Sequence, residues 1–120
     1  MEYIKCKQDL KEFLEYESEQ YSRKNTNIPL FAIKEKDVLY KLNYLLRKTE
    51  YAVNCNKISK NIWKLRLRLY ENKYEMTIPI NVFDKGVKFV HIGPRLVNGN
   101  AKVGKNCVMH INTAIVAGRN

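Results

Sequence analysis

Apolar residues recur at helical spacing in three stretches of the N-terminal part of the chain. The first stretch covers residues 7–23, and the second covers residues 35–49. The third begins after Ser59, a candidate N-cap, and continues to about Glu75. Each stretch carries an apolar stripe of the kind that one face of an amphipathic helix turns toward a core. The pattern therefore predicts a helical N-terminal domain over residues 1–76.

Two details of this pattern stay open. Residues 51–54 either continue the second helix or form a short third one. Leu65, Leu67 and Leu69 alternate with basic residues, and this alternation also fits a strand. The length of the stretch and its long side chains favour a helix.

Residues 97–120 follow a different period, with one apolar residue at the start of every group of six. A small residue lies four places later in the first three groups, and Asn and Gly fill many places between. A period of six is typical of a parallel β-helix, in which three groups close one coil of roughly 18 residues. The openers stack inside, and Asn and Gly tolerate the positive-φ corners. The openers are Val97, Val103, Met109 and Ile115, and the small residues are Ala101, Cys107 and Thr113.

Residues 78–118 also resemble a known family. The run Ile78-Pro-Ile-Asn-Val-Phe precedes a His-x-Gly turn at His91, and Val97-Asn-Gly-Asn-Ala-Lys-Val-Gly-Lys-Asn-Cys-Val-Met-His follows. In this order and spacing, the motifs resemble the entry into the catalytic domain of bacterial serine O-acetyltransferases, including the branch found with capsule and other polysaccharide synthesis genes. The resemblance implies an α+β protein in which the helical part leads into the first coils of a left-handed parallel β-helix over residues 77–120.

The resemblance also implies the chemistry. Members of the family transfer an acetyl group from acetyl-CoA to a hydroxyl, and L-serine, the acceptor in cysteine biosynthesis, is the first choice here. In relatives the active site lies in a groove between adjacent protomers of a trimer, so a homotrimer or larger assembly is expected once the β-helix is complete. The residues that bind CoA stay unknown. No metal is expected, because two histidines without a nearby carboxylate make a poor ligand set.

The chain has two histidines, His91 and His110, and both lie in the family-like segment. Acyl transfer to a hydroxyl needs a general base, and an imidazole suits this role near neutral pH. The two histidines are 19 residues apart, close to one coil, so we expect both as catalytic bases on neighbouring coils. In strict register, Met109 stacks on His91 and His110 points outward, whereas a slip at residues 93–94 turns both outward. Alternatively, each is a turn or surface histidine.

Two departures from the family limit the transfer of its chemistry. Serine acetyltransferases carry Asp where this chain has Val90, and their base is the His of a later Gly-Asp-Arg-His-Pro segment that is absent here. A sugar or polysaccharide hydroxyl therefore stays an alternative acceptor. The four groups of six make about one and a third coils, whereas solenoids need about three repeats. We therefore expect a truncated gene product, and a second interpretation is an inactive remnant that acts only as a helical interaction module.

Composition changes this picture only in part. The formal net charge of +10 favours anionic partners, and basic residues alternate with Trp63, Tyr70 and Tyr74 in the third stretch. A small nucleic-acid-binding module is thus a third interpretation, although no recognised nucleic-acid motif accompanies it. Three widely spaced cysteines favour a reducing cytoplasm over disulfides. No apolar run is long enough for a transmembrane helix, so no membrane partner is expected.

Overall fold

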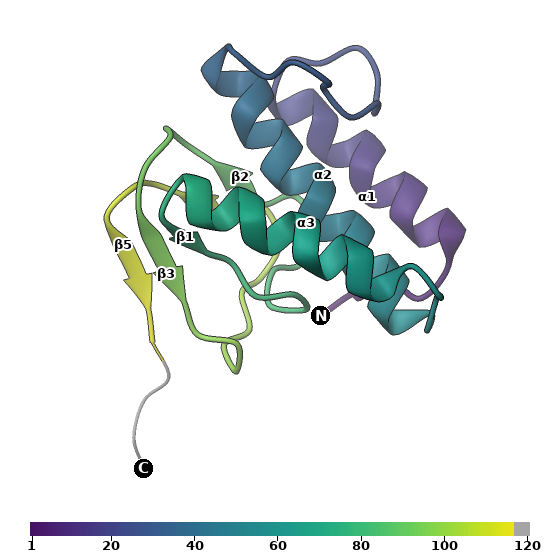
Figure 1. Ribbon diagram of the computed structural model, residues 1–120. Coiled ribbons are helices and arrows are strands. Elements are labelled where there is room, and N and C mark those ends of the chain that lie inside the picture. Colours follow the sequence, from purple (N-terminus) through teal and green to yellow (C-terminus); the bar gives the residue numbers. More distant parts are fainter. Residues whose placement is uncertain (117–120) are drawn as a thin grey trace.

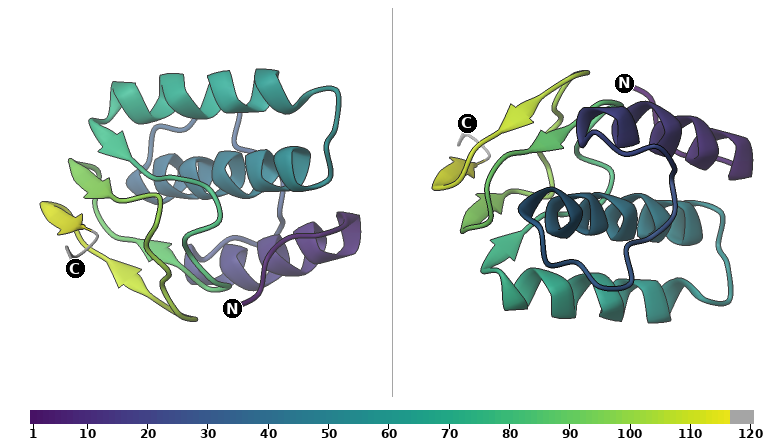
Figure 2. Two further views of the ribbon diagram at one scale, coloured as in Figure 1. Left: turned by 90° about the horizontal axis from the view of Figure 1, so that it is seen from below. Right: turned by 90° about the horizontal axis from the view of Figure 1, so that it is seen from above.

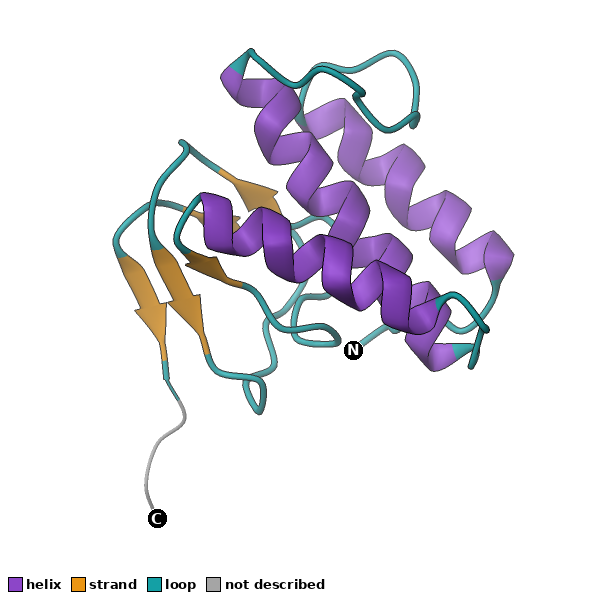
Figure 3. Cartoon of the chain, viewed as in Figure 1, coloured by secondary structure: helices purple, strands orange, loops and turns teal. Residues whose placement is uncertain are grey.

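The computed structural model describes residues 1–116, in which three helices are followed by five short strands (Figure 1). The helices are α1 (Lys7–Gln20), α2 (Glu35–Asn54) and α3 (Lys60–Lys73). The strands are β1 (Met76–Thr77), β2 (Lys88–Phe89), β3 (Arg95–Val97), β4 (Val108–Met109) and β5 (Thr113–Ile115). The expected α+β class is confirmed, with the helices first and short parallel strands after them (Figure 3).

The helices follow the predicted stretches closely. α1 begins at the predicted residue and ends at Gln20, because the chain turns at Ser22, whose φ is +56°. α2 continues to Asn54, so residues 51–54 extend the second helix rather than form a third. α3 is helical throughout, and the strand alternative for it is wrong. Ser59 lies at the N-cap position of α3, but its side chain makes no capping hydrogen bond.

The three helices lie side by side with α2 in the middle, and the strands stack against one side of this layer (Figure 2). The apolar stripe of α2 supplies most of the helical contribution to the core. Leu42 from this stripe belongs to the same buried cluster as Phe83 and Phe89 from the strand part. The predicted domains, residues 1–76 and 77–120, therefore share one hydrophobic core.

Three parallel ladders make up the strand part. One joins β1, β3 and β5, the second joins β2 and β4, and the third is a bridge between Phe83 and Val103. Paired residues lie 18 to 20 positions apart in the sequence. Val97 pairs with Ile115, as the six-residue period predicts for two openers one coil apart. The chain therefore returns to lie beside itself at close to the predicted interval.

At His91 the register differs from the strict prediction. Met109 pairs with Phe89 and not with His91. The cause is the length of the corners, because the one between β2 and β3 comprises residues 90–94, whereas the one between β4 and β5 comprises residues 110–112. The two additional residues of the first corner move His91 out of the stack and into a turn.

Side chains of the helices cover one edge of residues 76–94, which we call the first coil. Four backbone N–H groups of the first coil donate hydrogen bonds of 2.7 to 3.0 Å to helical side chains. A buried backbone group without a partner costs free energy, so these bonds take the place of a neighbouring ladder. The helices thus cap this end of the stack. The pairs are Ile78 with Glu71, Asn81 with Glu50, Gly86 with Glu17, and Phe89 with Tyr21.

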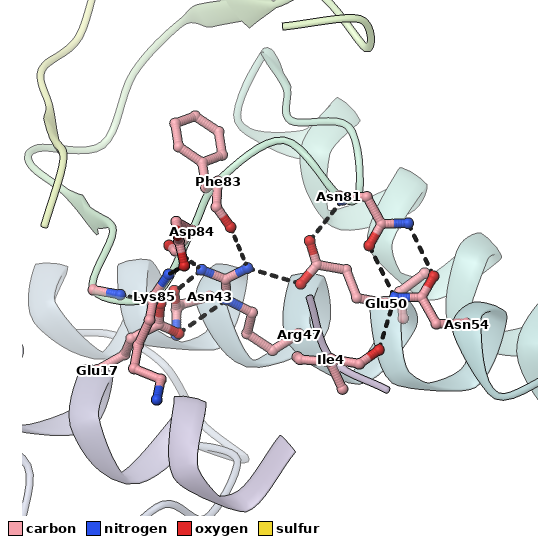
Figure 4. A network of polar contacts seen from close by, with 12 residues as sticks. Ile4, Glu17, Asn43, Arg47, Glu50, Asn54, Asn81, Phe83, Asp84 and Lys85 are labelled. Atoms are coloured by element: carbon pink, nitrogen blue, oxygen red, sulfur yellow. Dashed lines mark hydrogen bonds and ion pairs between the residues drawn. The ribbon is translucent and has the colours of Figure 1, made fainter. Parts of the chain in front are cut away.

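Arg47 joins α1, α2 and the first coil through a buried network (Figure 4). Its guanidinium donates two hydrogen bonds to Glu17, at 3.0 and 2.7 Å, and one to Glu50 at 2.8 Å. It also donates to the carbonyl oxygens of Phe83 and Asp84, both at 2.9 Å. All five N–H groups therefore have an acceptor. Burial alone lowers the pKa of Arg47, but the two carboxylates outweigh this effect and raise it.

Candidate functional site

His91 lies in the corner between β2 and β3, with a backbone φ of +65°. Non-glycine residues seldom adopt such a conformation, so surrounding contacts must hold it. The His91 side chain is 60% exposed, and its Nδ1 lies 3.1 Å from Oε1 of Glu35. Glu35 is the first residue of α2, where the positive end of the helix dipole favours a carboxylate. The fold thus gives this imidazole a carboxylate partner.

Arg95 holds the backbone of the same corner from inside the molecule. Its side chain is 3% exposed, and Nη2 donates to the carbonyl oxygen of Val90 at 2.9 Å and to that of His91. Burial lowers the pKa of Arg95. Its Nε and Nη1 have no hydrogen-bond partner among residues 1–116. Arg95 therefore positions the corner through two main-chain carbonyl groups and does not contact the imidazole through a hydrogen bond.

A hollow of about 180 Å³ lies beside His91, between the end of α1, the start of α2 and β2. Lys36 and Lys88 line this hollow and give it positive charge. Gln20 also lines it, and the side-chain oxygen of Gln20 is buried without a donor in the part of the chain that the structure describes. A buried acceptor without a donor is unfavourable, so a ligand N–H group would satisfy it. The hollow thus combines cations, one unpaired acceptor and an imidazole in a small volume.

His110 lies in the next corner, between β4 and β5, and its side chain is exposed. Because Phe89 pairs with Met109, His110 lies opposite Val90, one position from His91. Within residues 1–116, the His110 side chain forms no hydrogen bond, and none joins the two imidazoles. Both histidines therefore lie in stacked corners, but the carboxylate partner belongs to His91.

Other candidates from the sequence have structural roles. Asp84 is buried, and its carboxylate accepts hydrogen bonds from the backbone N–H of Lys85 at 2.7 Å and of Glu2 at 3.3 Å. Cys107 is half-buried against the core, as expected for a packing residue, and burial raises the pKa of its thiol. The described residues contain no group of three His, Cys, Asp or Glu side chains that could hold a metal ion.

Glu35, Arg95 and Gln20 were not predicted from the sequence. Glu35 precedes His91 by 56 residues, and a carboxylate in the first turn of a helix is usually explained by the helix dipole alone. Arg95 belongs to a strand in which the pattern suggests that apolar residues face inward, yet its guanidinium is buried and Leu96 is exposed. The only local signal is the isolated arginine that follows Gly93 and Pro94.

In residues 1–116, no helix combines the length and the apolar character that crossing a bilayer requires. Comparisons of the whole chain with protein-family models, with curated proteins and with solved structures give no match.

Proposed function

We propose that this protein is an acetyl-CoA-dependent O-acetyltransferase of the hexapeptide-repeat type, and that its parallel ladders are the first coils of a left-handed β-helix. The observation that carries the proposal is the pairing of His91 with Glu35 at a corner of these ladders. The interval of 18 to 20 residues between paired strands supports the coil. The resemblance of residues 78–118 to serine O-acetyltransferases supplies the reaction class.

His91 is the general base of the proposed reaction. In the tautomer in which Nδ1 donates its proton to Glu35, Nε2 carries the free lone pair. Nε2 then accepts the proton of the acceptor hydroxyl as the hydroxyl oxygen attacks the thioester carbonyl carbon of acetyl-CoA. The C–S bond breaks, and the proton on Nε2 passes to the departing CoA sulfur. Glu35 holds the ring in orientation and stabilises the imidazolium between these two transfers.

L-Serine is the acceptor that fits the hollow beside His91. Pockets for larger ligands usually measure about 300 to 1,000 Å³, so the 180 Å³ found here suits a small molecule. Lys36 and Lys88 can pair with the serine carboxylate, and the buried oxygen of Gln20 can accept a hydrogen bond from its ammonium group. A sugar hydroxyl is the second candidate, favoured by the 60% exposure of His91, which also admits an acceptor that stays outside the hollow.

The hollow is too small to hold the pantetheine arm of acetyl-CoA as well. We propose that this arm lies along the outer side of the corners, between protomers of a homotrimer. His110 lies exposed on the next corner, where it can act as a second base for a substrate held between protomers.

Release of CoA thiol from acetyl-CoA, with L-serine or a panel of sugars as acceptor, tests the proposal. We expect serine-dependent release, and we expect His91→Ala to lower kcat by about 10²- to 10⁴-fold. Glu35→Gln should lower kcat by about tenfold or more, because the ring loses its orienting carboxylate. The matched control Glu19→Gln removes an exposed carboxylate from α1 and should leave kcat unchanged.

Three outcomes would contradict the proposal or part of it. A folded protein that releases no CoA above the blank with any acceptor is the inactive interaction module and not an enzyme. A larger loss with His110→Ala than with His91→Ala reassigns the base. Release with sugars but not with serine moves the acceptor to the second candidate.

A further inference from the structure

The outward side of α3 carries a ridge of apolar side chains without a partner in residues 1–116. Only Leu67 and Glu71 of this helix are buried. The ridge follows helical spacing and therefore forms one continuous stripe on the side of α3 that faces away from α2 (Figure 2). Aligned exposed residues of this size mark an interaction surface more often than scattered ones do. The ridge comprises Ile58, Ile62, Leu65 and Leu69, whose exposed fractions lie between 59% and 104%.

Cations flank this ridge on both sides. Toward α2, a hollow of about 270 Å³ is lined by Lys41, Arg66 and Lys73 together with Leu69. Toward β1, a hollow of about 550 Å³ is lined by Lys64 and Arg68 together with Leu65. The carboxylate of Glu71 lines the second hollow as well, where it accepts the N–H of Ile78 at 2.8 Å. None of the five cations forms an ion pair with a described carboxylate.

This distribution of charge selects the kind of partner. If α3 packed against α3 of a second copy, Arg66 and Arg68 would flank the seam on both helices and oppose like charges. An anionic bilayer surface has the opposite requirement, because an amphipathic helix binds it with apolar residues in the interface and cations at the phosphates. The net charge of +10 adds long-range attraction to such a surface.

We propose that the α3 face docks the protein on an anionic phospholipid surface. The ridge enters the interfacial region, and the five flanking cations meet lipid phosphates. The sequence alone predicts no membrane partner, and the exposed ridge becomes evident only when the packing of the helices is known. Absence of a spanning helix concerns crossing of the bilayer, whereas this proposal concerns attachment to one leaflet. The proposal does not depend on acetyl transfer.

Trp63, the only tryptophan of the chain, provides a direct probe of this face. It lies on α3 beside the ridge, and the guanidinium of Arg66 is 4.6 Å from its ring centre. Vesicles of phosphatidylcholine, with or without about 30% phosphatidylglycerol, are titrated into the protein at low and at moderate salt. We expect co-sedimentation and a blue shift of Trp63 emission only with phosphatidylglycerol. Binding should fall at least tenfold as the salt rises from about 50 to 300 mM.

Matched variants locate the surface, and circular dichroism verifies their folding. Leu65→Ser with Leu69→Ser should weaken binding more than tenfold, because burial of each leucine contributes about 1.5 to 3 kcal/mol. Leu96→Ser, which removes an exposed leucine from β3, should leave binding unchanged. Likewise, Arg66→Glu with Lys73→Glu should abolish the shift.

The proposal is overturned if pure phosphatidylcholine binds equally well, or if no vesicle binds at all. It is also overturned if Leu96→Ser weakens binding as much as the ridge variant. Light scattering that shows self-association, dispersed by Leu65→Ser with Leu69→Ser, assigns this face to a second copy instead. Retention of a single-stranded oligonucleotide by the same cations, without vesicle binding, assigns it to nucleic acid.

Discussion

At the scale of single residues, the candidate site depends on partners that are distant in the sequence. Glu35 reaches His91 from the first turn of α2, and Arg95 holds the main chain of the same corner from beneath. These contacts exist only because α2 ends against the corner between β2 and β3. A histidine that would otherwise be a surface turn residue thereby becomes an oriented base.

The unpaired oxygen of Gln20 gives a test of the acceptor. Gln20→Leu removes the proposed partner of the serine ammonium group, so we expect a rise in KM for serine of about five- to thirtyfold with kcat nearly unchanged. Steady-state CoA release at varied serine concentration measures both constants. Gln8→Leu, an exposed glutamine on the same helix, is the control. An unchanged KM in the Gln20 variant would place serine elsewhere.

Glu71 gives a prediction about pH. Burial raises its pKa above the ordinary value of 4.5, against the opposing effects of the Ile78 N–H group and Arg68. The folded state therefore holds the proton more tightly than the unfolded state does. The stability that follows is fully present below pH 4.5 and is lost as the pH rises through the raised pKa of the folded protein.

Glu71→Gln keeps an oxygen for Ile78 and removes the buried charge. We expect its Tm to exceed that of the parent by about 2 to 5 °C at pH 7 and to match it near pH 4. Thermal unfolding followed by circular dichroism at both pH values makes this comparison. Glu19→Gln on the exposed side of α1 should show no such difference. A variant that is less stable at pH 7 would show that the charged form of Glu71 is the favoured one.

At the scale of elements, the Arg47 network joins α1 to α2 and both helices to the first coil. One guanidinium serves two buried carboxylates and two carbonyl groups. Burial raises the pKa of Glu50, and Arg47 opposes this rise. The network is therefore sensitive to the loss of its single cation.

Arg47→Met leaves Glu17 and Glu50 buried without a counter-charge. We expect a loss of about 3 to 5 kcal/mol in the free energy of unfolding, a large share of the 5 to 15 kcal/mol typical of a domain. Urea denaturation followed by circular dichroism measures this quantity. Arg66→Met, an exposed arginine on α3, should change it by less than about 0.5 kcal/mol. A comparable loss in both variants would show that the network has no special role.

The sequence predicted the elements better than their surroundings. The 3.6-residue period located all three helices, and the six-residue period predicted the interval between paired strands, because both periods follow from local geometry. Which side of α3 faces the core could not be predicted, since Leu67 points inward while Leu65 and Leu69 point outward. The partner of His91 could not be predicted either, because it depends on how α2 meets a corner 56 residues further along the chain.

At the scale of the whole molecule, helices and coils share one core, and this predicts a single unfolding transition. Phe83 is 1% exposed and contacts Phe89 edge to face, with ring centres 5.8 Å apart. We expect Phe83→Ala to cost about 3 to 5 kcal/mol. Trp63 fluorescence, which reports on α3, and far-ultraviolet circular dichroism should shift together in urea. Leu96→Ala, at an exposed position in β3, is the control. Separate midpoints for the two signals would divide the chain into independent units.

The cap on the first coil has a consequence for how this protein is made. The side chains that pair with Ile78, Asn81, Gly86 and Phe89 all come from helices that precede the coil in the chain. During translation these helices leave the ribosome before the coil does. The nascent strand segments therefore find hydrogen-bonding partners already waiting, and winding can start at the helices and proceed in one direction only, away from them.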